Sequence, residues 1–523
     1  REPLEVKLER LRPAIFDPAY EPLLTCKTAP EGIDLLACSS VNYYDGVTLA
    51  DLRGFEEKNP LNSRLVKRDG RVVEEVWRAG RAAGTEGEAI PSGRYASQLR
   101  TVIGFLTKAQ VFAPPDEGSA LRRLGDYFAS GTPDEFRRYN LEWVTLNPSV
   151  DTVQGFIETY HDPRGRKGGW QGMVFFSDPD RTRLLQGLAA EAHGFEERAP
   201  WDPRFKRRNF TPPVVAAVEI VLAVGDGGPS PPIGVNLPND DAIQEKVGNR
   251  SFLYANVLEA SNRATLQALT EEFALPEDRP MLQQHAVEAE ILLTAMHEAL
   301  GHAAGRSAEG LPAEPAVMLG ETYAALEEAR AELVALHAIF DPVLVERKLL
   351  SSPAVAEAAY RDYLLHDLSM LRRVRTGELL EDDHMRATHL IVEWLRAHDG
   401  GVEVVSRDGR TYFRVADVPA MRKGVATLLA EVQRIKGEGD RAAARALLDR
   451  YATRIDPRLR DEVVARADRA GIPSYMAFVM PEIVPVRDAS GEVVDASLEP
   501  GGDFTLQMLR FSGKLQREGD GPR

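Results

Sequence analysis

The chain has 523 residues, more than a single typical hydrophobic core accommodates, so its length indicates two or more structural units. Its hydrophobic content of 43% and its charged content of 28% are those of an ordinary globular protein. The net charge of −16 argues against nucleic acid as a principal partner, because phosphate binding needs a basic surface.

The pattern of apolar residues predicts strands first and a long helical region after them. Residues 169–177 and 214–224 are rich in β-branched, aromatic and other apolar side chains, which predicts two strands, the second one buried. From residue 261 to residue 396 strong helix formers dominate. Residues 483–498 hold two Val-rich arms around an Asp-Ala-Ser-Gly turn, which predicts a hairpin.

Residues 297–302, His-Glu-Ala-Leu-Gly-His, contain most of a zinc-hydrolase centre. His297 and His302 are suitable zinc ligands, and Glu298 is placed to act as the general base. The ordinary motif spaces its histidines at i and i+4, whereas here they lie at i and i+5. On a regular helix these side chains would point roughly 140° apart. We therefore expect a single-turn π-bulge, which Gly301 would permit.

A third ligand is predicted in residues 321–336, which form an uninterrupted stretch of helix formers. Glu328 and Glu332 lie at i and i+4, so one carboxylate could bind zinc while the other orients a ligand histidine. The alternative is that Glu327, Glu328 and Glu332 form a solvated face paired with Arg330. Only a short connection in the sequence separates this segment from the His-Glu motif, which favours the ligand interpretation. In that interpretation the fourth coordination position of the zinc stays open for water.

Five short segments together resemble the dipeptidyl peptidase III family of zinc exopeptidases. Two of them are His-Glu-x-x-Gly-His at 297–302 and Glu-Glu-x-Arg-Ala-Glu at 327–332. The others are residues 155–163, 234–239 and 383–387. The extra residue between the histidines is that family's signature, and the resemblance extends from about residue 150 to residue 398.

The resemblance implies a complete metal centre with one zinc ion per chain. Glu298 would activate the attacking water. The zinc ligands would be His297, His302 and Glu328, and the residues behind them Glu327 and Glu332.

The resemblance also implies residues that act on a peptide substrate. Tyr160 and His384 would polarise the scissile carbonyl and stabilise the oxyanion. Glu158, Asn236 and Asn239 would hold the free amino end and the first peptide units of the substrate.

Three positions depart from the family pattern. Gln171 stands where an acidic residue is expected, which would weaken the hold on a substrate ammonium group. The aspartate that supports a ligand histidine has no secure match, and Glu321 could replace it. Arg487 is the candidate for the arginine that binds the carboxylate of the peptide.

These features predict an α+β fold of two lobes around a wide cleft. Residues 1–179, 220–260 and 487–523 would form a mixed α/β lobe that binds substrate. Residues 180–219 and 261–486 would form a mainly helical lobe that carries the zinc. The expected activity is the zinc-dependent release of dipeptides from the amino end of short peptides. The alternatives are a zinc hydrolase of another amide, or a zinc-containing peptide-binding protein with little turnover.

Partners and compartment follow from simpler features. The predicted partner is a short peptide with a free amino end, without nucleic acid or membrane, since no apolar run approaches the roughly 20 residues that span a bilayer. Cys26 and Cys38 are the only cysteines, so they could pair or remain free thiols. A cytoplasmic location is expected. The alternative is export after loss of a leader, because the chain begins with Arg1.

Overall fold

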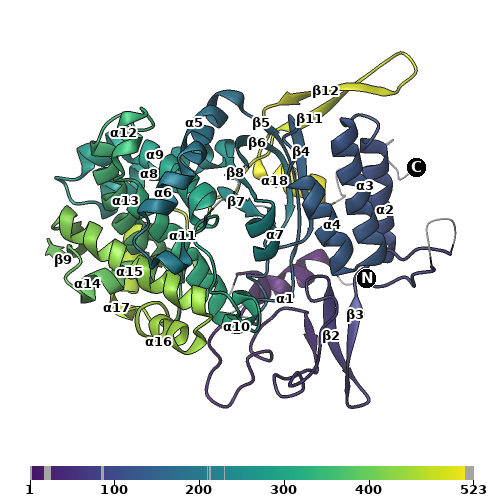
Figure 1. Ribbon diagram of the computed structural model, residues 1–523, viewed down its shortest axis with the longest axis horizontal. Helices are drawn as coiled ribbons and strands as arrows, with labels where there is room; N and C mark the ends of the chain where they lie inside the picture. The colour runs from purple at the N-terminus through teal and green to yellow at the C-terminus, as the bar shows by residue number, and fades with distance from the viewer. Residues whose placement is uncertain are drawn as a thin grey trace.

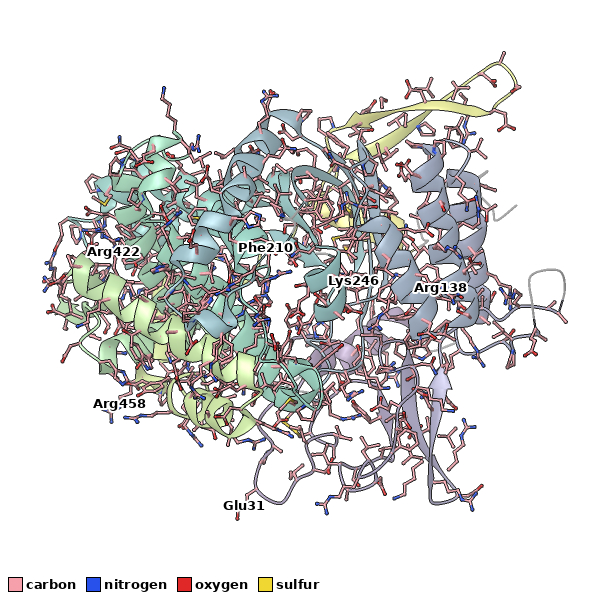
Figure 2. All side chains as sticks on the ribbon, viewed as in Figure 1. Glu31, Arg138, Phe210, Lys246, Arg422 and Arg458 are labelled. Atoms are coloured by element: carbon pink, nitrogen blue, oxygen red, sulfur yellow. A yellow bond between two sulfur atoms is a disulfide. The ribbon has the colours of Figure 1, made fainter. Side chains whose placement is uncertain are left out.

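The computed structural model describes residues 3–16, 25–83, 88–208, 210, 212, 214–228 and 230–512. The chain combines helices and strands, which confirms the predicted α+β class, and it is helix-rich on one side and sheet-containing on the other (Figure 1). Charged side chains such as Arg138, Lys246, Arg422 and Arg458 lie on the outside (Figure 2). Among the described residues, no helix is long and apolar enough to span a membrane.

The described N-terminal part contains a small sheet and four helices. Cys26 and Cys38, whose pairing the sequence left open, form a disulfide with their Cα atoms 5.8 Å apart. The elements here are α1 (Leu4–Phe16), β1 (Tyr44–Asp45), β2 (Ser63–Arg68), β3 (Arg71–Val76), α2 (Ala96–Ala109), α3 (Pro115–Ser130) and α4 (Pro133–Trp143).

A five-stranded sheet crosses the middle of the molecule in the order β4-β5-β6-β8-β7. Only the β6–β8 pair is parallel. The strands predicted at 169–177 and 214–224 are confirmed as β5 and β6. The strands are β4 (Val150–Phe156), β5 (Trp170–Ser177), β6 (Val214–Gly225), β7 (Gly234–Leu237) and β8 (Arg250–Tyr254).

Helices make up most of the remaining chain, as the composition of residues 261–396 predicted. The segments between the strands of the sheet hold α5 (Pro179–Ala190), which packs against β6, then α6 (Ala192–Arg198), the 3-10 turn η1 (Pro203–Phe205) and α7 (Asp241–Lys246). The helical side begins with α8 (Ala255–Phe273), α9 (Arg279–Met296), η2 (His297–Gly301), α10 (Pro315–Leu319), η3 (Gly320–Thr322) and α11 (Tyr323–Ala338). It continues with α12 (Pro342–Glu346), α13 (Ala354–Met370), η4 (Leu371–Arg373), α14 (Asp383–Ala397), α15 (Val418–Glu438), α16 (Arg441–Tyr451) and α17 (Pro457–Ala470), interrupted by the hairpin β9 (Val402–Arg407) and β10 (Arg410–Val415).

The predicted C-terminal hairpin is also present. It consists of β11 (Glu482–Arg487) and β12 (Val493–Glu499) and is followed by α18 (Phe504–Phe511). Most side chains of both strands are exposed, and Figure 1 shows the hairpin projecting from the top of the molecule.

Two hydrophobic clusters meet at the sheet. Along β6, Val215 and Ala217 belong to the helical cluster, whereas Ala216 and Val218 belong to the cluster that includes α2–α4. Successive side chains of a strand point to opposite faces, so β6 is buried on both of them. This explains why its sequence is an apolar run, interrupted only by Glu219, rather than an alternating one.

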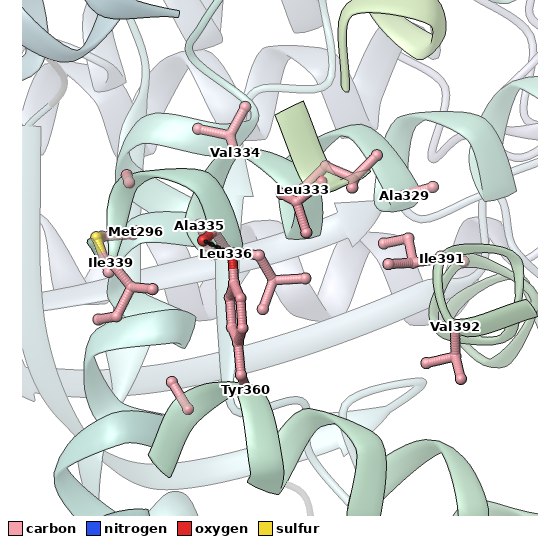
Figure 3. Packing of buried hydrophobic residues seen from close by; sticks show 14 of the residues in the cluster. Met296, Ala329, Leu333, Val334, Ala335, Leu336, Ile339, Tyr360, Ile391 and Val392 are labelled. Atoms are coloured by element: carbon pink, nitrogen blue, oxygen red, sulfur yellow. Dashed lines mark hydrogen bonds between the residues drawn. The ribbon is translucent and has the colours of Figure 1, made fainter. Parts of the chain in front are cut away.

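The helical cluster is built around α11. Leu333, Leu336 and Tyr360 are almost fully buried together, and the Tyr360 hydroxyl donates to the Leu336 carbonyl over 3.2 Å (Figure 3). Helix α11 is therefore surrounded by other helices over most of its surface. A cavity of ≈ 1690 Å³ lies beside it, lined both by strands of the sheet side and by α9, α11 and α14.

Candidate metal centre and cleft

The predicted π-bulge is present at residues His297–Gly301. The amide of His302 donates to the carbonyl of His297 over 3.2 Å, an i to i+5 bond that defines a π-helical turn. The wider turn brings the two imidazoles together, so that the Nε2 atoms of His297 and His302 lie 3.1 Å apart. Two side chains that would diverge on an α-helix thus point at one location.

Gly301 has a second role that the sequence did not show. A Cβ atom at this position would lie 2.7 Å from the Cα of Ala331 and 2.8 Å from its carbonyl oxygen. These contacts are closer than atoms of a folded protein tolerate, so only glycine lets α11 approach the π-turn. This approach places the acidic residues of α11 next to the histidines.

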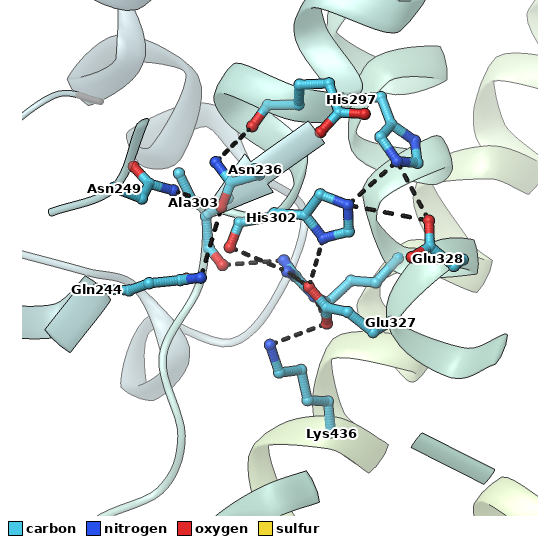
Figure 4. A network of polar contacts seen from close by, with 12 residues as sticks. Asn236, Gln244, Asn249, His297, His302, Ala303, Glu327, Glu328 and Lys436 are labelled. Carbon is cyan, nitrogen blue, oxygen red and sulfur yellow. Dashed lines mark hydrogen bonds and ion pairs between the residues drawn. The ribbon is translucent and has the colours of Figure 1, made fainter. Parts of the chain in front are cut away.

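Glu328 completes the candidate ligand set. Its Oε2 atom lies 3.2 Å from Nε2 of His297 and 3.9 Å from Nε2 of His302 (Figure 4). This buried oxygen makes no hydrogen bond of acceptable geometry, while Oε1 accepts the hydroxyl of Tyr160 over 2.7 Å. An unsatisfied oxygen facing two imidazole nitrogens is the arrangement expected of a metal ligand.

The neighbouring carboxylates define the donor set further. His297, Glu298 and His302 also place ligand atoms within 4.8 Å of one another. We favour Glu328 over Glu298 as the third ligand because its Oε2 atom lies within 3.9 Å of an imidazole nitrogen of both histidines and makes no hydrogen bond. Two imidazoles and one carboxylate suit zinc and leave a fourth position for water, so these side chains fit the metal.

The charges at the site are strongly coupled. Burial disfavours ionisation of Glu328, but His384, His302 and His297 outweigh it and hold the pKa of this carboxyl well below its usual value. Burial likewise disfavours a charged His297, but Glu328 and Glu298 raise the pKa of that imidazole to about 9. The protein surroundings of this centre therefore favour a positive charge between these side chains.

Glu327 supports the histidines from behind rather than binding metal. It lies 3.0 Å from Nδ1 of His302, and since an ionised carboxylate only accepts, the ring must donate from Nδ1 and keep Nε2 free. Glu327 also accepts from Arg330 over 2.9 Å and pairs with Lys436 over 2.8 Å. The predicted contact of Glu327 with Arg330 exists, but it is buried rather than solvated.

Glu332 lies one turn further along α11. It accepts hydrogen bonds from Tyr363 and, over 3.2 Å, from Thr388 of α14. Burial raises the pKa of Glu332 to about 7, although His297 opposes the shift. Glu332 therefore ties α11 to α13 and α14 and acts on His297 through its charge.

Glu298 points into the cleft beside strand β7. Its carbonyl accepts from Asn236 over 3.0 Å and from Ser251 over 2.9 Å, which fixes the π-turn to the sheet. A Cβ atom on Gly234 would lie 2.8 Å from the Glu298 side chain, so glycine there leaves room for this carboxylate. Burial raises the pKa of Glu298, although His297 and His302 oppose the shift.

Tyr160 and His384 come from opposite sides of the cleft and meet above the metal centre. Their ring centroids are 5.0 Å apart, and Nε2 of His384 lies 3.7 Å from Oε2 of Glu328. Burial and the charge of Glu328 keep the pKa of Tyr160 well above its usual value, so its hydroxyl remains a proton donor.

Comparison with known proteins agrees with this geometry. Residues 73–310 match the sequence profile described as Peptidase family M49. Dipeptidyl peptidase 3 of Rattus norvegicus is 25% identical over 438 residues, which are 72% of this chain and 57% of the rat protein. The chain thus spans a little over half the length of this curated relative. Over residues 73–310, a little under half of its length, the chain is therefore similar to peptidase family M49.

Two solved structures share the fold. Dipeptidyl-peptidase III from Corallococcus sp. strain EGB superposes with a TM-score of 0.69 at 21% identity, covering 83% of this chain and 77% of that one. DPP III from Caldithrix abyssi gives a TM-score of 0.62 at 22% identity, covering 82% and 78% of the two chains.

The residues that were predicted to hold substrate divide into two kinds. Glu158 lines the cleft and accepts from Asn239 over 3.0 Å, and burial raises its pKa to about 7. Asn236 is only 6% exposed, and its amide bonds to Ser251, Glu298, Asn249 and Gln244. Because these contacts occupy its donors and acceptors, the structure supports a positioning role for Asn236 instead of the predicted direct hold on substrate.

Three further predictions fare differently. Gln171 does line the cleft, where it is 3% exposed and its Nε2 atom has no hydrogen-bond partner. Arg487 lies on the exposed C-terminal hairpin, donates to Gly491 over 2.9 Å and is absent from the described cleft lining, so its predicted role is not supported. Glu321, in η3 directly before α11, pairs with Arg441 and Arg445 of α16 and not with a histidine, so its predicted role is not supported.

The first prediction separates the two adjacent carboxylates of α11. Glu328→Ala should abolish tight zinc binding, because two ligands remain. Glu327→Ala should retain zinc with an affinity lowered about 10- to 100-fold, as expected for a support residue. Elemental analysis and competition with a chelator measure both. Loss of zinc from Glu327→Ala but not from Glu328→Ala would reverse the assignment.

The second prediction concerns the approach of α11 to the π-turn. Gly301→Ala should destabilise the protein by about 1–3 kcal/mol through overpacking against Ala331, and should weaken zinc binding because α11 is displaced. A Gly301→Ala protein with the parent's melting temperature and zinc affinity would show that close approach is not required.

Proposed function

We propose that this protein is a zinc-dependent exopeptidase that releases dipeptides from the amino end of short peptides. The observation that carries the proposal is the convergence of His297, His302 and Glu328 in a cleft large enough for a peptide. Glu298 lies beside this group, and Tyr160 faces it from the sheet side. Similarity to a peptidase family supports peptides as the class of substrate.

The chemistry divides between the metal and the side chains around it. When bound, zinc would supply Lewis-acid polarisation of the scissile carbonyl and lower the pKa of water. Glu298 would take a proton from the attacking water and return it to the leaving amine. The hydroxyl of Tyr160, kept protonated, would donate to the carbonyl oxygen as negative charge develops on it, and His384 would supply a second donor.

The amino end of the substrate would be held by Glu158. Its carboxylate lines the cleft on the sheet side and is oriented by Asn239. A substrate ammonium group at this carboxylate would place the second peptide bond near the metal, which is what dipeptide release requires. Asn236 would contribute by fixing β7 to the π-turn.

We further propose that the sheet side and the helical side act as two lobes that close over the peptide. Closure would exclude water and strengthen the charge interactions at the reacting carbonyl. The domain limits given above stay a prediction, as does one zinc ion per chain. For the compartment, the Cys26–Cys38 disulfide favours the export alternative, because disulfides persist in oxidising surroundings.

One observation favours an alternative substrate. Gln171 is neutral and buried in the cleft wall, with an unsatisfied amide nitrogen. A donor at this place suits a carbonyl or carboxylate of the substrate better than an ammonium group. The protein would then hydrolyse another amide at the same centre. Indifference to blocking of the substrate's amino end would support this alternative.

The third prediction tests the general base. Glu298→Gln should retain zinc, because Glu298 is not a ligand in this assignment, and should lower kcat about 100- to 10,000-fold on a dipeptidyl-arylamide. Chelation of the parent protein should abolish turnover, and added zinc should restore it. A Glu298→Gln protein with near-parent kcat would exclude the proposed role. A parent protein with zinc but without turnover would instead indicate a peptide-binding protein.

The fourth prediction tests selection of the amino end. A shielded carboxylate–ammonium bond contributes about 1.5–3 kcal/mol, so Glu158→Gln should lower kcat/KM roughly 10- to 100-fold on a free dipeptidyl-arylamide. The same change should have little effect on the acetylated substrate and none on zinc content. Glu314→Gln, at another carboxylate in the cleft wall, is the matched control. Equal losses on both substrates would assign Glu158 a structural role.

A further inference from the structure

A short N-terminal segment bridges the two sides of the cleft. This strap, Thr25–Thr28, is neither helix nor strand, and the Cys26–Cys38 disulfide anchors it. Toward the sheet side, the hydroxyl of Thr25 donates to the carbonyl of His161 over 2.8 Å, and Nζ of Lys27 donates to the carbonyl of Asp162 over 3.0 Å. Both acceptors directly follow Tyr160 in the chain.

The same strap contacts the start of α14, which carries His384. The amides of Lys27 and Thr28 donate to Glu381 over 2.6 and 3.2 Å. Nζ of Lys27 lies 3.3 Å from Oδ2 of Asp383, the residue before His384. Arg386 donates to the hydroxyl of Thr28 over 2.9 Å. The strap therefore joins two segments that are more than 200 residues apart in sequence.

Lys27 is the central residue of this bridge. The side chains of Lys27 and Asp383 are each 1% exposed, and neither oxygen of Asp383 has a hydrogen bond of acceptable geometry. A buried charge is costly unless it is paired, so each of these two charges depends on the other. Removing the ammonium group would leave a buried carboxylate at the first turn of α14.

The loop on the other side is rigid enough to transmit the position of Lys27. The carboxylate of Asp162 is fully buried and accepts the amides of Arg166 and Lys167 over 2.7 and 2.8 Å. It also accepts the hydroxyl of Tyr44 over 2.7 Å. A shift of the Asp162 carbonyl would therefore move the loop as a unit, with Tyr160 at its start.

We infer that Lys27 is a positioning residue that holds the Tyr160 loop against the start of α14, so that Tyr160 and His384 face each other over the metal centre. The part of this inference that concerns turnover rests on the proposed function; the part that concerns the bridge does not. Misplacing catalytic groups by about 1 Å lowers rates on the order of 100-fold, so the expected effect falls on kcat rather than on KM.

The experiment compares Lys27→Met, Asp383→Asn and the double variant in the full chain. Lys27→Met should lower kcat about 10- to 100-fold on a dipeptidyl-arylamide, with KM and zinc content near those of the parent. If Lys27 acts through Asp383, the double variant should lose less than the product of the two single effects. Lys67→Met, at an exposed lysine paired with Asp51, is the control and should behave as the parent.

Hydrogen exchange gives a readout that does not need activity. In the Lys27→Met protein, the amide hydrogens of residues 158–169 and 381–388 should exchange faster than in the parent, and those of other regions should be unchanged. This result would support the bridge even if the parent protein hydrolysed no arylamide, which would count against the proposed function alone. Three outcomes would each overturn the inference. The first is a Lys27→Met protein with the kcat and the hydrogen exchange of the parent. The second is a double variant whose loss of kcat equals the product of the two single losses, and the third is faster exchange along the whole chain.

A second variant covers the case in which Lys27→Met does not fold. Replacing both Cys26 and Cys38 with serine releases the strap while it leaves Lys27 and Asp383 in place. This protein should show the same local increase in exchange and a smaller decrease in kcat. Parent-like exchange at residues 158–169 and 381–388 would overturn the inference.

Discussion

The contact of Gly301 with the backbone of Ala331 is the constraint on which the metal centre depends. Two histidines at i and i+5 converge only on a π-turn, and the π-turn acquires its third partner only if α11 lies against it without an intervening side chain. A missing Cβ at Gly301 thus brings a carboxylate of α11 to 3.2 Å from one imidazole. The burial of α11 among other helices holds this geometry in place.

The adjacent carboxylates of α11 show how surroundings assign different roles to one residue type. Glu327 meets Arg330 and Lys436, so its charge is balanced by the protein and it can orient His302. Within the described part of the chain, the cationic partners of Glu328 are histidines alone, and one of its oxygens stays unsatisfied. Both side chains are buried, so burial does not distinguish them. Their different partners make Glu327 a support residue and Glu328 a candidate ligand.

Sequence patterns predicted the features that are local. The spacing of His297 and His302 predicted the π-turn, and the apolar run of residues 214–224 predicted a buried strand. Features that depend on distant segments were not predictable in this way. The saturation of Asn236 depends on Asn249, Ser251 and the carbonyl of Glu298, and Arg487 was assigned to the cleft although its hairpin projects into solvent. The partnership of Glu327 with Lys436 joins residues more than 100 positions apart.

The sheet and the strap place the substrate-side groups relative to the metal by different means. On one flank, Asn236 of β7 bonds to the carbonyl of Glu298, so the strand and the π-turn are joined by neutral hydrogen bonds. On the other flank, Lys27 joins the loop after Tyr160 to the helix of His384 through a buried ion pair. A neutral hydrogen bond contributes little free energy by itself. In a buried ion pair, by contrast, removing one partner leaves the other charge buried and unpaired, which costs much more free energy. The flank that carries Tyr160 and His384 is therefore the one whose geometry is more strictly fixed.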